Sequence, residues 1–229
     1  MIGELHMSLI GSRLSAVTRL LFDVKDNTLF ADIGSDHAFL AIEVLKSGLA
    51  EAAIASDINE QPLLKGKENA ARSGVKIDFY LSDGFDAIDS LPITSAAICG
   101  MGGELIAKII DRSRVAHEAT LIVQPMSAQE DLRKYLWDNG FVIEKEIFTF
   151  EAGKSYTVMR LRFCGEKTEY SYIDLFLGKE REQSREFSLY CEKILTAAKK
   201  RRLGVVARNE DTAEIDGLID FCQTQTMSL

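Results

Sequence analysis

The sequence predicts an α/β fold, in which a mostly parallel sheet is covered by helices on both faces and is followed by a small helical domain. Three observations lead to this prediction. Short apolar segments alternate with helix-like segments as far as residue 139, which is typical of parallel sheets buried on both faces. Two strand-like segments then follow each other directly, and after Cys164 such segments stop.

The individual elements follow from the spacing of apolar residues. The first is an amphipathic helix at residues 9–21. Buried strands are expected at residues 28–33, 52–57, 76–81, 96–99 and 121–123. Between them, helices are expected at residues 38–46, before Gly48, from about Pro62 to residue 73, from Gly103 to residue 110, and at residues 127–139.

The region after residue 140 changes the topology. Residues 141–150 and 156–163 are rich in aromatic and β-branched residues and are joined through Glu151-Ala152-Gly153-Lys154. This connection is too short for a crossover helix, so the two strands must pair antiparallel. The expected architecture is a Rossmann-like seven-stranded sheet with an antiparallel strand 7. By analogy of fold, this hairpin is typical of methyltransferases that use S-adenosylmethionine.

The end of the chain is expected to be helical. A helix is expected at residues 172–203, ending at Gly204, and a second at residues 212–222. Together they predict a helical hairpin resembling a coiled coil. The predicted domains are therefore residues 1–165, a Rossmann-like domain that binds S-adenosylmethionine, and residues 166–229, a helical hairpin.

Composition excludes several classes of protein. No apolar run reaches the length of about 18 residues that a spanning helix needs, so no membrane partner is expected. Glu4 stands where a signal peptide carries bases, and the four cysteines are widely spaced without a CxxC pair. A cytoplasmic monomer without metal is expected. The net charge of −8 argues against indiscriminate binding to phosphate backbones but allows a local basic face, such as Lys199-Lys200-Arg201-Arg202.

The ends of the strands predict a ligand site, because ligands of open parallel sheets bind there. The first turn, Asp32-Ile33-Gly34-Ser35-Asp36, lacks the later glycines of the dinucleotide fingerprint. Asp36 would repel a pyrophosphate. S-adenosylmethionine carries a sulfonium and an ammonium instead, so Asp32, Asp36 and Glu104 would favour it.

The next two strand ends extend this pattern. Asp57 ends the second strand, about 20 residues beyond Gly34, where a carboxylate takes ribose hydroxyls. Asp83, between Ser82 and Gly84, follows the third strand and could accept from the adenine amino group. Each aspartate alone could equally be a helix N-cap or an Asx turn.

Three segments resemble a known family. Residues 31–38 (ADIGSDHA), residues 98–106 (ICGMGGELI) and Gln124-Pro125 are similar to those of the bacterial tRNA adenine-N1 methyltransferases that modify adenine 22. The resemblance covers about residues 8–163, and the helical tail resembles the coiled-coil appendage of that family. It implies that Asp36 and His37 help to position the reactants. The expected cofactor residues are Asp32, Gly34, Ser35, Asp36, Asp57, Ile58, Ser82, Asp83, Gly84, Gly100, Met101, Gly102 and Gly103.

The target atom is constrained by the fourth strand end. Cys99-Gly100-Met101-Gly102 offers no Asp/Asn-Pro-Pro-aromatic turn for an exocyclic amine, and Cys99 lacks the preceding proline of carbon methyltransferases. Adenine N1 has its own lone pair, so its attack on the methyl group requires mainly positioning and desolvation. The adenine must leave its pair to be reached.

The expected partner is tRNA, with S-adenosylmethionine converted to S-adenosylhomocysteine. The expected substrate contacts are Arg13, Arg19, Gln124, Lys199, Lys200, Arg201 and Arg202. Two alternatives stay open at this point. One is a methyltransferase of the same fold acting on a small molecule or a protein, which needs no basic track. The other is a nicotinamide or nucleotide-sugar enzyme or an inactive binding module, which needs space for a pyrophosphate.

Overall fold

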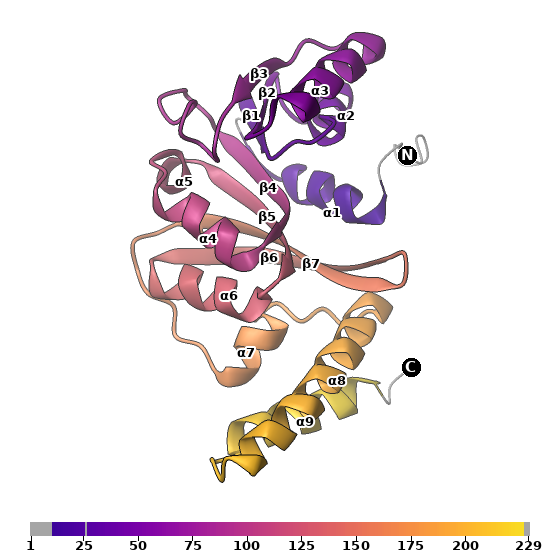
Figure 1. Ribbon diagram of the computed structural model, residues 1–229, viewed down its shortest axis with the longest axis vertical. Coiled ribbons are helices and arrows are strands. Elements are labelled where there is room, and N and C mark those ends of the chain that lie inside the picture. Colours follow the sequence, from indigo (N-terminus) through magenta and orange to yellow (C-terminus); the bar gives the residue numbers. More distant parts are fainter. Residues whose placement is uncertain (1–10, 26, 227–229) are drawn as a thin grey trace.

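The computed structural model describes residues 11–25 and 27–226 (Figure 1). The strands are β1 (Leu29–Ile33), β2 (Ala52–Asp57), β3 (Asp78–Leu81), β4 (Ser95–Gly102), β5 (Thr120–Ser127), β6 (Phe141–Glu151) and β7 (Lys154–Phe163). The helices are α1 (Ser12–Leu21), α2 (Phe39–Lys46), α3 (Glu60–Ser73), α4 (Gly103–Asp111), α5 (Val115–Glu118), α6 (Gln129–Asp138), α7 (Tyr172–Leu177), α8 (Arg185–Ala207) and α9 (Ala213–Thr226). The part of the first predicted helix before residue 11 lies outside the described residues.

The sheet confirms the predicted fold class. Its seven strands lie in the order β3-β2-β1-β4-β5-β7-β6. Strands β1 to β5 are parallel, whereas β7 runs antiparallel between β5 and β6. This order places the carboxyl ends of β1 and β4 side by side at the centre of the sheet.

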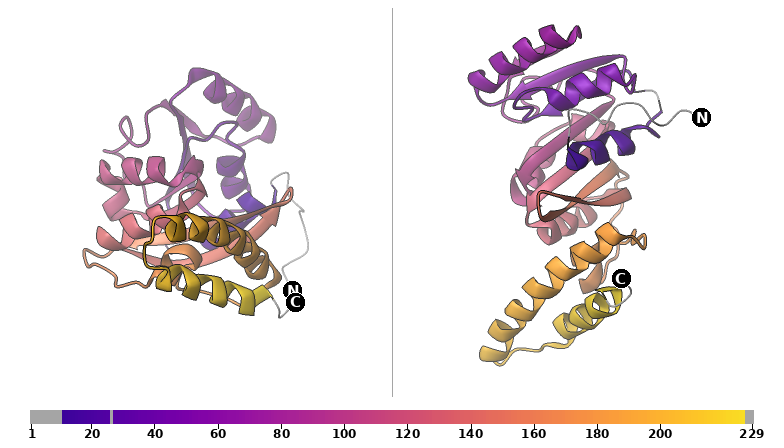
Figure 2. Two further views of the ribbon diagram at one scale, coloured as in Figure 1. Left: turned by 60° about the horizontal axis from the view of Figure 1, so that its bottom comes forward. Right: turned by 90° about the vertical axis from the view of Figure 1, so that its right-hand side faces the viewer.

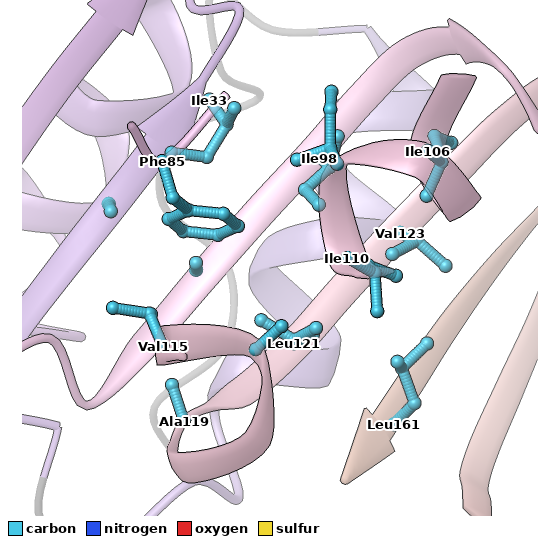
Figure 3. Close-up of a cluster of buried hydrophobic side chains, with 14 of the residues drawn as sticks. Ile33, Phe85, Ile98, Ile106, Ile110, Val115, Ala119, Leu121, Val123 and Leu161 are labelled. Atoms are coloured by element: carbon cyan, nitrogen blue, oxygen red, sulfur yellow. The ribbon is translucent and has the colours of Figure 1, made fainter. Parts of the chain in front are cut away.

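Two apolar layers hold the helices on the sheet. Alternate strand residues point to opposite faces, so Phe30 packs beneath α1 and α2 whereas Ile33 packs with α4. Figure 3 shows the second layer, in which Ile98 and Leu121 from the strands meet Ile110 from α4. Burial of each such large side chain stabilises the fold by about 1.5–3 kcal/mol. These layers fix the central strand ends at which the candidate site lies.

The helices at the end of the chain form a separate small core. Helices α8 and α9 lie side by side as a hairpin next to the sheet (Figure 2). Phe148 of β6 joins this core, with its ring centroid 4.9 Å from those of both Phe187 and Tyr190. The hairpin prediction is confirmed, and its coiled-coil character stays a prediction.

A buried ion pair ties α7 to the sheet domain. Arg133 of α6 and Glu146 of β6 approach within 2.5 Å, and their side chains are 0% and 1% exposed. Arg133 also donates to the backbone carbonyl oxygen of Leu175 in α7, at 2.7 Å. Thr157 donates its hydroxyl to Glu146. We call this group of residues the α6–α7 clasp.

The structure corrects several predicted boundaries. A single helix over residues 172–203 is wrong, because α7 ends at Leu177 before Gly178, which has φ +72°. Helix α8 begins after Ser184, which accepts a hydrogen bond from the Phe187 N–H at 3.1 Å, and it continues past Gly204 to Ala207. Gly204 is therefore not the stop. Strands β4 and β5 extend through Gly102 and Ser127, beyond the apolar runs that predicted them.

Within residues 11–25 and 27–226, none of the helices is both long and apolar enough to span a membrane.

Candidate functional site

A cavity of about 410 Å³ lies at the carboxyl ends of β1 and β4. It is lined by Arg13, Leu14, Asp32, Gly34, Ser35, Asp36, His37, Phe39, Leu40, Cys99, Gly100 and Met126. The structure thus brings together the predicted residues of the first turn, Gly100 from the end of the fourth strand, and Arg13.

The turn after β1 is held in one conformation by backbone contacts. The N–H groups of Gly34 and Ser35 both donate to the carbonyl oxygen of Ser56 in β2, at 2.8 and 2.9 Å. Gly34 has φ +69°, and a Cβ there would lie 2.1 Å from the Met101 methyl carbon. The positive φ favours glycine at this position, whereas the Met101 methyl group is the end of a flexible side chain that can shift. Met101 therefore lies beneath the turn, not in the cavity wall.

Asp36 and His37 project from this turn towards solvent. Asp36 has φ 48°, a left-handed conformation that aspartate tolerates better than most residues. Its Oδ2 lies 3.6 Å from His37 Nε2, and the two side chains are 71% and 44% exposed. Their exposure suits groups that contact an incoming substrate, and it does not identify either as a strong base.

Asp32 is the buried acid of the cavity. Its residue is 4% exposed. Burial raises the pKa of its carboxyl to about 7, the nearby charge of Asp57 acts in the same direction, and a hydrogen bond from the Ala41 backbone N–H opposes the rise. A cationic partner stabilises the charged form of such a buried carboxyl. The cavity is therefore suited to a ligand with an ammonium or sulfonium group.

Asp57 and Asp83 lie along the same sheet edge but outside the lining of the cavity, whereas Glu104 lines another cavity, of about 390 Å³, between α4 and α6. Asp57 Oδ1 accepts a hydrogen bond from the backbone N–H of Asn59 at 2.9 Å. The loop after β3 stays beside it, because the Ser82 N–H donates to the Asp57 carbonyl oxygen at 2.9 Å. Ile58 is 63% exposed on this edge.

Asp83 has a cationic partner that the sequence did not identify. Arg112, which follows α4, lies 2.7 Å from Asp83 Oδ1 and donates to its carbonyl oxygen at 2.8 Å. Ser82 donates to the carbonyl oxygen of Gly84, at 3.0 Å. The Asp83 turn is therefore held in place from two sides, and no motif in the sequence links Arg112 to it.

The glycines after β4 have two different roles. Gly100 has φ +78° and lines the cavity. By contrast, a Cβ at Gly103 would lie 2.3 Å from the carbonyl oxygen of Ala128, and one at Gly102 would lie 3.3 Å from Ser127 Oγ. Gly102 and Gly103 thus allow α4 to start against the end of β5. They do not line the cavity as the sequence predicted.

Gln124 places Arg13 at the mouth of the cavity. The Gln124 side chain is buried, and its Oε1 accepts hydrogen bonds from Arg13 Nη1 at 2.8 Å and from the Gly100 N–H at 3.2 Å. The Arg13 N–H in turn donates to Glu151 Oε2 at 2.8 Å. Glu151 is a contributor that the sequence analysis missed, because 138 residues separate it from Arg13.

Arg19 is not part of this site. It is exposed and lines a different cavity of about 720 Å³, together with Asp23, Glu180 and Glu182. A separation of six residues on a helix turns the two arginines to different faces. Of the two arginines expected to contact the substrate, the structure places Arg13 at the cavity and Arg19 away from it.

Cys99 lines the cavity as a protonated thiol. Burial raises its pKa, the Asp32 charge raises it further, and Arg13 lowers it. Because the thiolate is the nucleophilic form of cysteine, this thiol is unsuited to a covalent step.

The predicted basic run lies away from the cavity. Residues 199–202 belong to the second half of α8. Arg202 pairs with Asp216 of α9, and the Arg201 guanidinium lies 5.7 Å from the centre of the Phe176 ring. Lys199 and Lys200 are exposed. The two lysines therefore face solvent, whereas each of the two arginines contacts another helix at the end of the chain.

Known proteins share this architecture. A family model described as "Methyltransferase domain" matches residues 10–159. The tRNA (adenine(22)-N(1))-methyltransferase of Bacillus subtilis (strain 168) is 30% identical over 159 residues, which is 68% of this chain and 67% of that protein. The match to the family model covers the residues that line the cavity and the sheet as far as Met159 in β7.

Solved structures extend the likeness to the helical part. A protein of Streptococcus pneumoniae proposed to be a tRNA (m1A22) methyltransferase matches 95% of this chain and 100% of its own, with 27% identity and a TM-score of 0.80. The same protein in complex with S-adenosyl-L-methionine matches over the same shares, with 29% identity and a TM-score of 0.78.

Proposed function

The chain belongs to the tRNA (adenine(22)-N(1))-methyltransferases and contains a methyltransferase domain, and we infer from this that it transfers a methyl group to N1 of adenine 22 in tRNA. S-adenosylmethionine is the methyl donor, and S-adenosylhomocysteine is the product. The alternative of a small-molecule or protein substrate is disfavoured by this relationship.

The residues of the cavity fit the methyl donor. Asp32 provides a buried carboxyl that is suited to an ammonium group. The buried Ser35 Oγ also lines the cavity and has no hydrogen-bond partner among the described residues, so a polar ligand atom would satisfy it. A pyrophosphate would instead meet two acids, Asp32 and Asp36. The buried Asp32 is the single observation on which this assignment of the cavity rests.

The neighbouring strand ends would hold the nucleoside half of the donor. Asp57 is proposed to accept from the ribose hydroxyls. Asp83, held by Arg112, is proposed to accept from the adenine amino group. Ile58 and the Ser82-Asp83-Gly84 turn would border the ring. These roles agree with the spacing of the residues along one edge of the sheet.

The bound donor supplies an electrophilic methyl group on a sulfonium. The task of the protein is then to place adenine N1 in line with that methyl group in a site from which water is excluded. Because N1 attacks with its own lone pair, no strong base is needed, and the protonated Cys99 takes no covalent part. Asp36 and His37 are proposed to position the adenine from the exposed rim.

The substrate side of the site is proposed to be formed by Arg13 at the cavity, with the buried Gln124 positioning it, and by Lys199 and Lys200 on α8. Gln124 accepts from the Arg13 guanidinium and Glu151 accepts from the Arg13 backbone N–H, so Arg13 is positioned before RNA arrives. We further propose that residues 1–165 form the catalytic domain, that residues 166–229 form an RNA-contacting domain, and that the protein acts in the cytoplasm on tRNA.

A methyl-transfer assay tests this function. Purified protein is incubated with labelled S-adenosylmethionine and unmodified tRNA, and the tRNA is digested for nucleoside analysis. We expect N1-methyladenosine at position 22 and no label in a matched tRNA that carries guanosine there. Label at another nucleotide or none in tRNA would contradict the proposal.

A further inference from the structure

A second cavity, of about 620 Å³, lies between the tip of the β6–β7 hairpin and the first half of α8. We call it the hairpin groove and define it by Met126, Phe150, Lys154, Tyr156, Glu192 and Lys193. Figure 1 shows the hairpin tip beside the beginning of α8. The Lys193 ammonium donates to the backbone carbonyl oxygen of Ser155, at 3.2 Å, and thereby connects α8 to the hairpin.

The hairpin groove adjoins the cofactor cavity through two contacts. Met126 is 41% exposed and lines both cavities. Arg13, from the first cavity, lies 5.8 Å from the centre of the Tyr156 ring in the second. The groove therefore lies next to the cavity that would receive a target base.

The lining of the hairpin groove has the chemistry of a single-stranded RNA site. Phe150 is 42% exposed and Tyr156 is half-buried, and both residues line the groove. Lys154 and Lys193 are exposed on the same groove, against one carboxylate from Glu192. Aromatic faces that stack bases, combined with cations that neutralise phosphates, are typical of proteins that bind unpaired nucleotides.

The larger cavity beside Arg19 does not share this chemistry. Its lining includes Asp23, Glu146, Glu180 and Glu182, against Arg19 and Lys145. Lys145 is already paired with Asp23. A polyanion is therefore favoured at the hairpin groove over the larger cavity.

We propose that the hairpin groove binds the nucleotide next to the target adenine, with its base against Tyr156 and Phe150 and its phosphate near Lys154 and Lys193. This inference rests on the proposed function, because it requires tRNA as the substrate. It gives a physical reason for the position of α8: one half of the helix completes a nucleotide site beside the reaction centre. Extrusion of the adenine from its helix also unstacks its neighbour, and the groove would compensate for that stacking.

The test compares variants in steady-state methylation of tRNA. Tyr156→Ala and Phe150→Ala are expected to raise the KM for tRNA by about 5-fold or more, because base stacking on an aromatic ring contributes about 1–3 kcal/mol. Tyr156→Phe keeps the ring and is expected to stay within about 2-fold of the parent. The affinity for S-adenosylmethionine, measured by calorimetry, should be the same in all three variants.

A modified tRNA identifies the nucleotide. Removal of the base on either side of the target gives two abasic tRNAs. With the parent enzyme, one of these abasic tRNAs should have a higher KM than intact tRNA. With Tyr156→Ala, the same abasic tRNA should have the same KM as intact tRNA, because the ring and the missing base belong to one contact. Additive effects for both tRNAs would overturn the assignment.

The lysines are tested by salt dependence. Lys154→Gln and Lys193→Gln should each reduce the slope of log affinity against log salt by about 0.7, the value for one phosphate of a single strand. Lys76→Gln, an exposed lysine just before β3, is the matched control and should leave the slope unchanged. If the parent methylates tRNA and the Tyr156→Ala and Phe150→Ala variants match its KM, the groove proposal is wrong although the proposed function stands. If the parent methylates no tRNA, both proposals fail.

Discussion

The buried carboxyl of Asp32 links the stability of the protein to pH. In the chain without ligand, its carboxyl has a pKa of about 7 against an ordinary value of 3.8, chiefly because of burial. Between these two values the folded state binds more protons than the unfolded state. Linkage then requires the contribution of Asp32 to the stability of the protein without ligand to fall as pH rises from about 4 to about 7.

We therefore expect Asp32→Asn to be more stable than the parent, by a larger margin at pH 8 than at pH 5. At pH 8 the parent buries a charge that asparagine lacks, whereas at pH 5 both side chains are neutral. Thermal melting of both proteins without ligand, at the two pH values, measures this. Asp36→Asn, at the exposed neighbour, is the control and should change the melting temperature by the same amount at the two pH values. A margin that does not grow with pH would show that Asp32 is not buried as a charge.

Asp57 carries the second residue-scale prediction. If it accepts from the two ribose hydroxyls, Asp57→Ala removes charge-assisted bonds that contribute about 1.5–3 kcal/mol each. Affinity for S-adenosylmethionine should then fall by at least about 10-fold in calorimetry. Asp78→Ala, at the opposite end of the neighbouring strand, is the control. Because Asp57 also accepts from the Asn59 N–H, the folded state of each variant is checked by its melting temperature. Unchanged affinity in a folded Asp57→Ala variant would reject the ribose assignment.

At this scale, the sequence predicted the carboxylates better than their partners. Asp32 and Asp36 could be found because each stands at or just after the end of an apolar strand. Arg112 and Glu151 could not, because each acts on a residue that is distant in the chain, and side chains of both types are common on any surface. Arg19 lies away from the cavity for a related reason, since charge and proximity in sequence do not determine which face of a helix a residue occupies.

At the scale of elements, the predicted helix boundaries were wrong at two glycines. An interior glycine costs a helix only about 1 kcal/mol relative to alanine, so packing decides whether the helix continues. Gly204 is helical near the far end of α8, whereas Gly178 ends α7. A Cβ at Gly178 would lie 2.0 Å from Glu146 Oε2, so the clasp leaves no room for a side chain at the residue where α7 ends.

The α6–α7 clasp gives the element-scale prediction. Arg133→Met leaves Glu146 buried without its cation and is expected to lower the free energy of unfolding by about 3–5 kcal/mol. The double variant Arg133→Met/Glu146→Leu removes both charges and should recover most of that loss. Urea unfolding of the parent and the single and double variants measures both effects. If the double variant is as unstable as the single one, the loss comes from the shape of the side chains rather than from the stranded charge.

At the scale of the whole molecule, the parallel sheet and its antiparallel strand were predictable, because connection lengths restrict topology strongly. The placement of the helical hairpin was not, since it depends on Phe148, Arg133 and Lys193, whose contacts lie far away in sequence. The fold class therefore followed from local pattern, whereas the route from the cofactor cavity to α8 required the structure.

The exposed lysines on α8 give the prediction at this scale. Lys199→Gln/Lys200→Gln should weaken tRNA binding and reduce its salt slope by about one unit for each phosphate that the variant no longer neutralises. Affinity for S-adenosylmethionine should stay constant, because the lysines lie outside the cavity. Arg202→Gln is the comparison, and it should affect the slope less because Arg202 is already paired with Asp216. A slope in the lysine variant equal to that of the parent would reject an RNA role for this part of α8.

The insertion of β7 between β5 and β6 also has a consequence for synthesis on the ribosome. Until residues 154–163 have left the exit tunnel, β5 has no neighbour on one side. The nascent chain then presents a free strand edge that contains Leu121, Ile122 and Val123, and an unpaired apolar edge promotes aggregation. Strands β1 to β4, which carry the Asp32 and Gly100 turns, are already complete at that stage. A message truncated before codon 154 is therefore expected to yield an aggregating fragment that still contains the residues of the donor site, and not a soluble inactive one.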